Sequence, residues 1–263
     1  MLRALVAAVL IGVVCAVVGS FVILRGMALF GDALAHAILP GIAIAYLIGG
    51  AAGPLFGGAL AAALITALII GVITRGGRVR EDTAIGVIFS GAFALGVALM
   101  NAYFKEEVEL EHILFGDISA LANADLALIA GFGILVLLAL AAFYKELVIV
   151  SFDPIHAASL RLPAEALRHL LLGLIAITVV VSVQTIGSAL MTAMLVTSAA
   201  TASLVTRRLS RMILIGSLLG AGSGSVGIYI AYYAGIASGA AIVLVATACF
   251  LIVWAATQVW RRR

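Results

Sequence analysis

The chain consists of long apolar runs, each about as long as a helix that crosses a lipid bilayer. Such a helix needs about 20 mainly apolar residues, because the hydrocarbon core is about 30 Å thick. Breaks at glycine, proline and charge divide the 263 residues into nine runs, expected at about 4–24, 31–50, 55–74, 83–103, 125–144, 168–186, 188–206, 212–233 and 237–259. The sequence therefore predicts an all-α polytopic membrane protein with a single transmembrane domain over 1–263. Two joins, after the sixth and eighth runs, are almost without polar residues, so a re-entrant or broken helix and eight crossings are the alternative.

Charge supports the same class of protein. Only 10% of the residues are charged and 65% are hydrophobic, whereas soluble domains carry about 25% charged residues. The net charge of +3 comes largely from short arginine clusters between runs, which indicate membrane orientation and give no support for nucleic-acid binding. Cys15 and Cys249 lie within apolar runs, so neither a disulfide framework nor a thiolate metal site is expected.

The positive-inside rule orients the chain. If all nine runs cross, the basic clusters fall on one side, after the first, third, fifth, seventh and ninth runs: Arg25; Arg75, Arg78 and Arg80; Lys145, Arg161 and Arg168; Arg207, Arg208 and Arg211; and Arg261 to Arg263. An acidic loop over about 104–124 falls on the other side, and Arg3, at the outer end of the first run, opposes this arrangement. We expect the amino terminus outside and the carboxyl terminus in the cytoplasm.

The second run contains two side chains that can carry charge near neutral pH, Asp32 and His36. Their i, i+4 spacing places both on one face of a helix. A buried acid costs roughly 2.5 to 3.5 kcal/mol by insertion scales, so such residues usually face a protein interior or a water-filled path. The alternative is structural: Asp32 caps the start of the helix, and His36 is a neutral histidine bonded to a backbone carbonyl. Pro40 either loosens the helix beyond the pair or is a tolerated kink.

The longest predicted cytoplasmic loop contains a short helix. Asp153 directly precedes Pro154, and this pair provides an N-cap and a ring suited to the first helical turn. About eight residues of helical character follow and end near Pro163. With other cytoplasmic loops so short, a helix here indicates a docking element for a partner.

Catalytic motifs are missing from the sequence. The two lysines, Lys105 and Lys145, lie outside any GxxxxGK[ST] loop, and there is no HExxH. Ser90 is a poor partner for His36 in a hydrolase, because it is expected at the other end of its helix pair and serves better as a packing residue. We therefore expect a protein that is not an enzyme, and any ATPase must be a separate subunit.

Five segments, in order along the chain, resemble the ABC-3 group of bacterial manganese, iron and zinc permeases. They are GSFVILRGMALFGDALAHAILPGIAIAYLIG, REDTAIGVIFSGAFALGVAL, LEHILFGDISAL, SFDPIHAASLRLP and VQTIGSALMTAMLVTSAATASLVTRRLSRM. The resemblance implies a type II-like ABC importer permease of the bacterial inner membrane, a homodimer on two cytosolic ATPase subunits, which receives metal from an extracytoplasmic binding protein. It also implies that Asp32 and His36 are metal-path residues.

The same resemblance makes the cytoplasmic segment around 153–163 a coupling helix that seats in the ATPase. The residues implied in this contact are Phe152, Asp153, Pro154, Ala157, Leu160 and Pro163. Three positions differ from the family pattern. Ala35 replaces the serine of many manganese-type members, Ser198 replaces a usual proline, and Gly235 replaces a frequent acidic residue. Ala35 resembles zinc-type members, while HAILPG and EDTAIGVIFSG resemble the manganese and iron type.

The chemistry of the pair fits this implication. Carboxylate and imidazole suit Mn(II), Fe(II) and Zn(II) better than Cu(I). One chain offers two ligands, and a twofold axis between two copies of the second run brings four together. No bound cofactor is expected besides the transported metal. The alternative function is a self-sufficient secondary transporter or channel for metal or protons, but inverted repeats are not detected.

Several polar residues within spans leave two interpretations open. Those of the sixth and seventh runs either line the path or bond between helices, with the second favoured; they are Gln184, Thr185, Thr192, Thr197, Ser198 and Thr201. GAGSGSVG in the eighth run permits either tight packing or local unwinding. In the outer loop, His112 is expected to be a surface histidine. Glu111 and Asp117 either contact a metal-loaded binding protein or are ordinary solvent-exposed acids.

Overall fold

The structure is a computed structural model that describes residues 2–50, 53–103, 121–152, 157 and 159–261. Over these residues it is helical and contains no strand. Nine helices or helix pairs in the described residues are long and apolar enough to cross a membrane, as predicted. Most of the outer loop, including Glu111, His112 and Asp117, lies outside the described residues, as do Asp153 and Pro154.

Each span has defined bounds. The elements are α1 (Leu2–Leu24), α2 (Phe30–Ala37), α3 (Leu39–Gly49), α4 (Leu55–Ile73), η2 (Arg75–Gly77), α5 (Glu81–Tyr103), α7 (Asn123–Ala142), α8 (Tyr144–Phe152), α10 (Ala164–Ile186), α11 (Ser188–Thr192), η4 (Ala193–Thr197), α12 (Ser198–Val205), α13 (Leu209–Ala234) and α14 (Ser238–Arg261). The second span is α2 followed by α3, and the seventh is α11, the π-helical segment η4 and α12.

Two spans differ from their predicted form. The sixth was expected to start near residue 168, but α10 starts at Ala164, because Glu165 and Arg168 form ion pairs and are tolerated in its first turns. The seventh is interrupted by a π-helical segment, which sequence periodicity does not reveal. The single residue Gly187, with φ of 83°, separates α10 from α11, and only glycine adopts this backbone conformation without strain.

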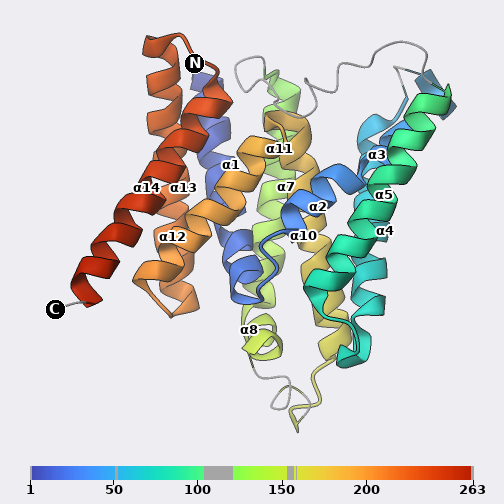
Figure 1. The fold of residues 1–263 in the computed structure, drawn as a ribbon, viewed down its shortest axis with the longest axis horizontal. Helices are drawn as coiled ribbons and strands as arrows, with labels where there is room; N and C mark the ends of the chain where they lie inside the picture. The colour runs from blue at the N-terminus through green and yellow to red at the C-terminus, as the bar shows by residue number, and fades with distance from the viewer. Residues whose placement is uncertain (1, 51–52, 104–120, 153–156, 158, 262–263) are drawn as a thin grey trace. The chain divides into compact units, whose positions relative to one another are not determined.

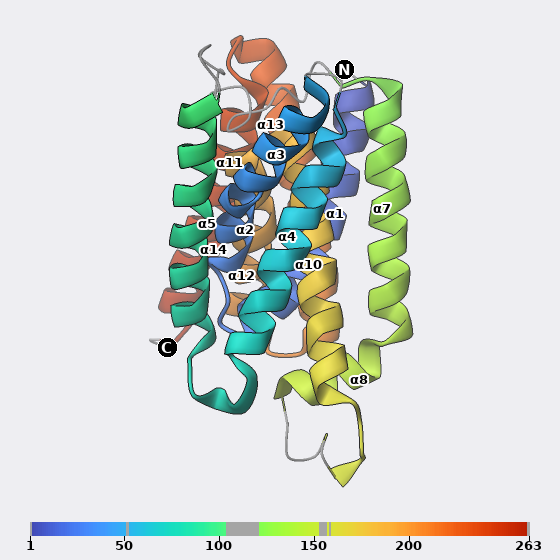
Figure 2. The same ribbon diagram turned by 90° about the vertical axis from the view of Figure 1, so that its right-hand side faces the viewer.

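Contacts group the chain into two compact units, unit 1 (Met1–Ala28, Leu110–Leu137 and Val181–Arg263) and unit 2 (Leu29–Glu109 and Leu138–Val180). In unit 1, α13 lies beside α1 and α14 (Figure 1). In unit 2, α3 packs against α4 and α5 (Figure 2). A single domain over 1–263 stays a prediction.

Helices in unit 1 approach one another through glycine. A Cβ atom built at Gly12 of α1 would lie 2.7 Å from the carbonyl oxygen of Gly220 in α13, and one at Gly220 would lie 2.5 Å from the oxygen of Gly12. Small residues allow this close approach of helix backbones in membranes. Because α13 is continuous through 220–227, the glycine-rich segment there serves tight packing and is not unwound.

Unit 2 uses the same device. Gly41 of α3 and Gly58 of α4 face each other, and a Cβ at either would come within 2.3 Å of the other's carbonyl oxygen. A Cβ at Gly96 of α5 would lie 2.6 Å from Cβ of Leu39. These contacts hold α3, which follows the Asp32 and His36 helix directly, between α4 and α5.

Candidate functional site

Asp32 and His36 lie on α2, a helix of eight residues that contains both within its first and last turns. The helix ends at Ala37, and α3 begins at Leu39 with Pro40 in its first turn. Proline at position 40 has no N–H to donate to the carbonyl of His36, four residues earlier, as a continuous helix requires. The break therefore falls between the pair and Pro40, which decides the choice between a loosened helix and a mild kink.

The two side chains share one face, as their spacing predicted. The Nε2 atom of His36 lies 3.8 Å from Oδ1 of Asp32. This distance exceeds a hydrogen bond but allows an ion pair if the imidazole is protonated. The side chain of His36 is 24% exposed and that of Asp32 is 48% exposed, so both remain accessible to a small ligand.

Neither structural alternative for the pair is observed. The cap position of α2 is Leu29, which makes no side-chain cap hydrogen bond. Asp32 instead lies in the first turn, where the helix dipole favours a carboxylate. In the described part of the chain, the ring of His36 contacts Asp32 and two phenylalanines, and no backbone carbonyl accepts a hydrogen bond from it.

Two aromatic rings from α5 pack against His36. The ring centroids of Phe89 and Phe93 lie 5.9 Å and 5.8 Å from that of His36, with interplanar angles of 47° and 75°. Such distances and tilts are typical of favourable aromatic pairs. The two phenylalanines therefore limit the rotation of the imidazole and cover one side of it. The i, i+4 spacing of Phe89 and Phe93 was visible in the sequence, but lipid-facing aromatics show the same pattern.

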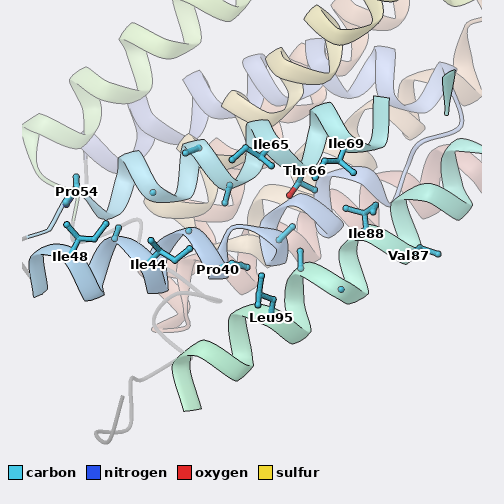
Figure 3. Close-up of a pocket in the computed structure, with 18 residues that line it drawn as sticks. Pro40, Ile44, Ile48, Pro54, Ile65, Thr66, Ile69, Val87, Ile88 and Leu95 are labelled. Carbon is cyan, nitrogen blue, oxygen red and sulfur yellow. The ribbon is translucent and has the colours of Figure 1, made fainter. Parts of the chain in front are cut away.

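Figure 3 shows an apolar groove. Its lining begins at Ala37, the residue that follows His36. Its volume is about 720 Å³, and it is lined by Ala37 at the end of α2 and by residues of α3, α4 and α5, beginning with Pro40. Thr66 is the labelled wall residue with an oxygen atom in its side chain. The lining contains no carboxylate or imidazole, so the groove itself offers nothing to a metal ion.

The ligand count of the described residues is low. No group of three or more histidine, cysteine, aspartate or glutamate side chains gathers among them. Asp32 and His36 thus supply two ligands, one short of the three that a protein usually provides to a zinc ion with an open position. If both bound one ion at about 2.1 Å in tetrahedral geometry, their ligand atoms would lie about 3.4 Å apart. The observed spacing is close to this value.

The polar residues of the sixth and seventh spans differ from one another in their hydrogen-bond partners. The hydroxyl groups of Thr185 and Thr201 donate to carbonyls within their own spans, at Val181 (2.8 Å) and Thr197 (2.6 Å). For these two, bonding between helices was the wrong prediction. The hydroxyl groups of Thr192 and Ser198, which flank the π-helical segment, have no hydrogen-bond partner among the described residues.

Two further positions have structural explanations. Gly235 ends α13 with φ of 65°, a left-handed conformation in which glycine is the preferred residue. The hydroxyl group of Ser90 donates to the carbonyl of Gly86 on its own helix at 2.8 Å. Ser90 is thus exposed on the helix surface, whereas a packing residue was expected. It directly follows Phe89, whose ring contacts His36, so its predicted place at the other end of the helix pair is also wrong.

The described residues of the predicted coupling segment show the last turn of a helix and its end. Ala157 and Ser159 have helical backbone, and the amide of Leu162 donates to the carbonyl of Ala157 at 3.1 Å. Arg161 between them has φ of 54°, so the end is a Schellman turn. Phe152 and Leu160 are 53% and 50% exposed, Pro163 is exposed, and Ala157 is fully buried.

Comparison with known proteins shows the family of this chain. A model of the ABC 3 transport family matches residues 1–257. The chain belongs to the ABC-3 transport family. As a member of this family the chain is a transport component and not an enzyme. The nine apolar helices in the described part of the chain make it a multi-pass protein of the bacterial inner membrane.

Relatives of this ABC-3 protein are similar over nearly the whole chain. The manganese transport system membrane protein MntC of Halalkalibacterium halodurans is 44% identical over 95% of this chain and 85% of its own length. The chelated iron transport system membrane protein YfeD of Yersinia pestis is 36% identical over 96% and 84%. Among solved structures, PsaBC from Streptococcus pneumoniae in complex with Fab matches with a TM-score of 0.81 and 39% identity, over 96% of this chain and 90% of that one.

Proposed function

We propose that this ABC-3 protein is the membrane-spanning permease subunit of an ATP-driven importer of divalent transition metal ions, with Mn(II) or Fe(II) favoured over Zn(II). The observation that carries the proposal is the Asp32 and His36 pair, which has 3.8 Å between its ligand atoms and is partly exposed within an apolar span. The manganese and iron transport names of MntC and YfeD support the choice of metals.

The metal ion is the cargo, and the pair gives it a transient contact. Oxygen and imidazole nitrogen are ligands that Mn(II), Fe(II) and Zn(II) accept. A second copy of the chain, related by a twofold axis, contributes its own Asp32 and His36, and water completes the coordination shell. A site that holds the ion weakly suits transport, since the ion must also leave it.

Partner subunits complete the importer. The two cytosolic ATPase subunits bind the segment 152–163, where Phe152 and Leu160 offer exposed apolar side chains. An extracytoplasmic binding protein delivers the metal to the opposite face, on which the amino terminus lies. ATP coupling is favoured over a self-sufficient carrier because the chain belongs to an ABC family and carries no nucleotide-binding loop of its own.

Metal uptake tests the proposal. Cells that express the complete importer with Asp32→Asn or His36→Ala are expected to take up radioactive or isotopically labelled Mn(II) at least ten-fold more slowly, with Fe(II) and Zn(II) measured in parallel. Ser90→Ala is the matched control, because its hydroxyl group bonds to its own helix, and uptake should stay unchanged. Uptake of all three metals at the wild-type rate by both variants would refute the proposal that Asp32 and His36 contact the transported metal.

A further inference from the structure

A cluster of polar side chains joins three helix ends in unit 2. We call Thr74, Glu81 and Arg168 the Arg168 cluster. Thr74 ends α4, Glu81 begins α5, and Arg168 lies in the second turn of α10. Figure 2 shows these three helix ends at the same end of the unit. Arg168 is 13% exposed and its Nη2 atom lies 2.7 Å from Oε1 of Glu81.

The guanidinium group of Arg168 forms hydrogen bonds with residues at the ends of both α4 and α5. Its Nη2 atom also donates to the hydroxyl group of Thr74, and its Nη1 atom donates to the carbonyl of Thr74 at 3.3 Å. Thr74 is the residue that caps the end of α4, and its carbonyl also accepts a hydrogen bond from the amide of Gly77 at 3.3 Å. Planar and with five N–H donors, arginine can satisfy a carboxylate and a carbonyl together, which the ammonium of lysine does less well.

A second ion pair nearby provides a contrast. The Nε atom of Arg75 lies 4.0 Å from Oε2 of Glu165, and these side chains are 71% and 47% exposed. An exposed pair at this distance contributes little to stability. It links the same region of the molecule with the same residue types, so it is a natural control for the shielded Arg168 cluster.

On one side, the cluster adjoins the proposed coupling segment. The Schellman turn at Arg161 ends that segment, and α10 starts three residues later. The amide of Leu167 donates to the carbonyl of Pro163 at 3.0 Å, so helical bonding runs from the last residue of the segment into the turn that carries Arg168. A displacement of the segment therefore moves the guanidinium group.

On the other side, the cluster adjoins the candidate metal pair. α5 is one continuous helix from Glu81 to Tyr103. Phe89 follows Glu81 by eight residues, or about 12 Å along the axis at 1.5 Å per residue, and with Phe93 it packs against His36. A shift of α5 at Glu81 therefore changes the packing of the imidazole.

We propose that Arg168 is a positioning residue that couples the ATPase-docking segment to His36 through Glu81, α5 and the rings of Phe89 and Phe93. The inference rests on the proposed function. Arg168 does not touch the metal ion; it sets where α5, and with it the imidazole, lies when the docking segment moves. Loss of the cluster should therefore separate ATP hydrolysis from transport, while the complex still assembles.

Transport per ATP hydrolysed is the measurement that tests this role. The complete complex, with ATPase subunits and binding protein, is reconstituted in proteoliposomes, and Mn(II) uptake and phosphate release are recorded together. For Arg168→Gln and Glu81→Gln we expect at least a ten-fold fall in ions moved per ATP, with ATP hydrolysis retained to half of wild type or more. The double variant should be no worse than either single one, and Arg168→Lys should recover part of the ratio. Arg75→Gln should leave it unchanged.

Three results would overturn the inference. They are an unchanged ratio in Arg168→Gln and Glu81→Gln, an equal loss of uptake and hydrolysis, or an equal effect of Arg75→Gln. If Arg168→Gln does not co-purify with the ATPase, Arg168→Lys and Glu81→Gln carry the test alone. Asp32→Asn in the same vesicles separates the two proposals, because wild-type uptake in that variant counts against the metal path and leaves the result for Arg168 standing.

Discussion

The contact between Gly41 and Gly58 permits a sharp test of how α3 is held. A Cβ atom at Gly58 would lie 2.3 Å from the carbonyl oxygen of Gly41 and 2.7 Å from Cβ of Ala45. Gly57, the preceding residue on α4, is exposed, and a Cβ there would meet Pro54 at an ordinary 3.8 Å. Gly57→Ala and Gly58→Ala therefore add the same methyl group to the same helix. At position 57 the methyl group makes an ordinary contact, and at position 58 it collides with the backbone of α3.

The expected magnitudes follow from two opposing terms. Alanine favours a helix over glycine by about 0.8 to 1.0 kcal/mol, and this gain is common to both variants. Ordinary contact begins near 3.4 Å, so at Gly58 the two helices must separate by about 1 Å. Overpacking of this kind costs about 1 to 3 kcal/mol. Because the helix term cancels, Gly58→Ala should be less stable than Gly57→Ala by about 1 to 3 kcal/mol.

Denaturation of the purified protein in detergent measures this difference, and Mn(II) uptake measures its effect on function. Since α3 follows the Asp32 and His36 helix directly, we expect slower uptake in Gly58→Ala and none of this slowing in Gly57→Ala. Equal stability of the two variants would refute the packing argument. Reduced stability with full uptake would show that the position of α3 does not matter to the pair.

The remaining predictions concern unit 1 and the coupling segment. Gly19→Ala should destabilise by more than Gly222→Ala, because its Cβ would meet the carbonyl of Leu195 while that of Gly222 meets nothing within 4 Å; equal melting temperatures would contradict this. Cys15 is fully buried, with Sγ 3.6 Å from Oγ of Ser182, so maleimide should label it after denaturation and not before, as mass spectrometry can check. Arg161→Gly should stabilise by about 1 kcal/mol, since φ is 54° there, and should keep ATPase co-purification; a lower melting temperature would argue against the Schellman turn.

The spans and the geometry of the pair could be predicted from the sequence for simple reasons. An apolar run of about 20 residues is typical of a transmembrane helix. An i, i+4 spacing puts two side chains on one face of a helix wherever the helix lies. For Pro40 the sequence left a loosened helix and a tolerated kink both open, because a missing N–H group is compatible with either. These features depend on residues within one or two turns of each other.

The surroundings of the pair could not be predicted in the same way. In a membrane helix, the side that faces lipid is as apolar as the side that packs, so nothing in the sequence distinguishes Phe89 and Phe93 from lipid-facing rings. Arg168 was interpreted only as a charge that orients the chain, because its bonds to Thr74 and Glu81 join residues 94 and 87 positions apart. The π-helical segment Ala193–Thr197 likewise has no local signature in its residue types.

The short length of α2 has a mechanical consequence. With its end at Ala37, the helix can tilt about Ile38, and the Cα atoms of His36 and Asp32 lie about 3 Å and 9 Å along the axis from that point at 1.5 Å per residue. A swing of about 10° then carries the Cα atom of Asp32 roughly 1.6 Å and that of His36 roughly 0.5 Å. Metal bonds to oxygen and nitrogen are only about 2.1 Å long. Because the two ligand atoms lie 3.8 Å apart on the same short helix, such a swing keeps their spacing and would carry both away from a fixed ion together.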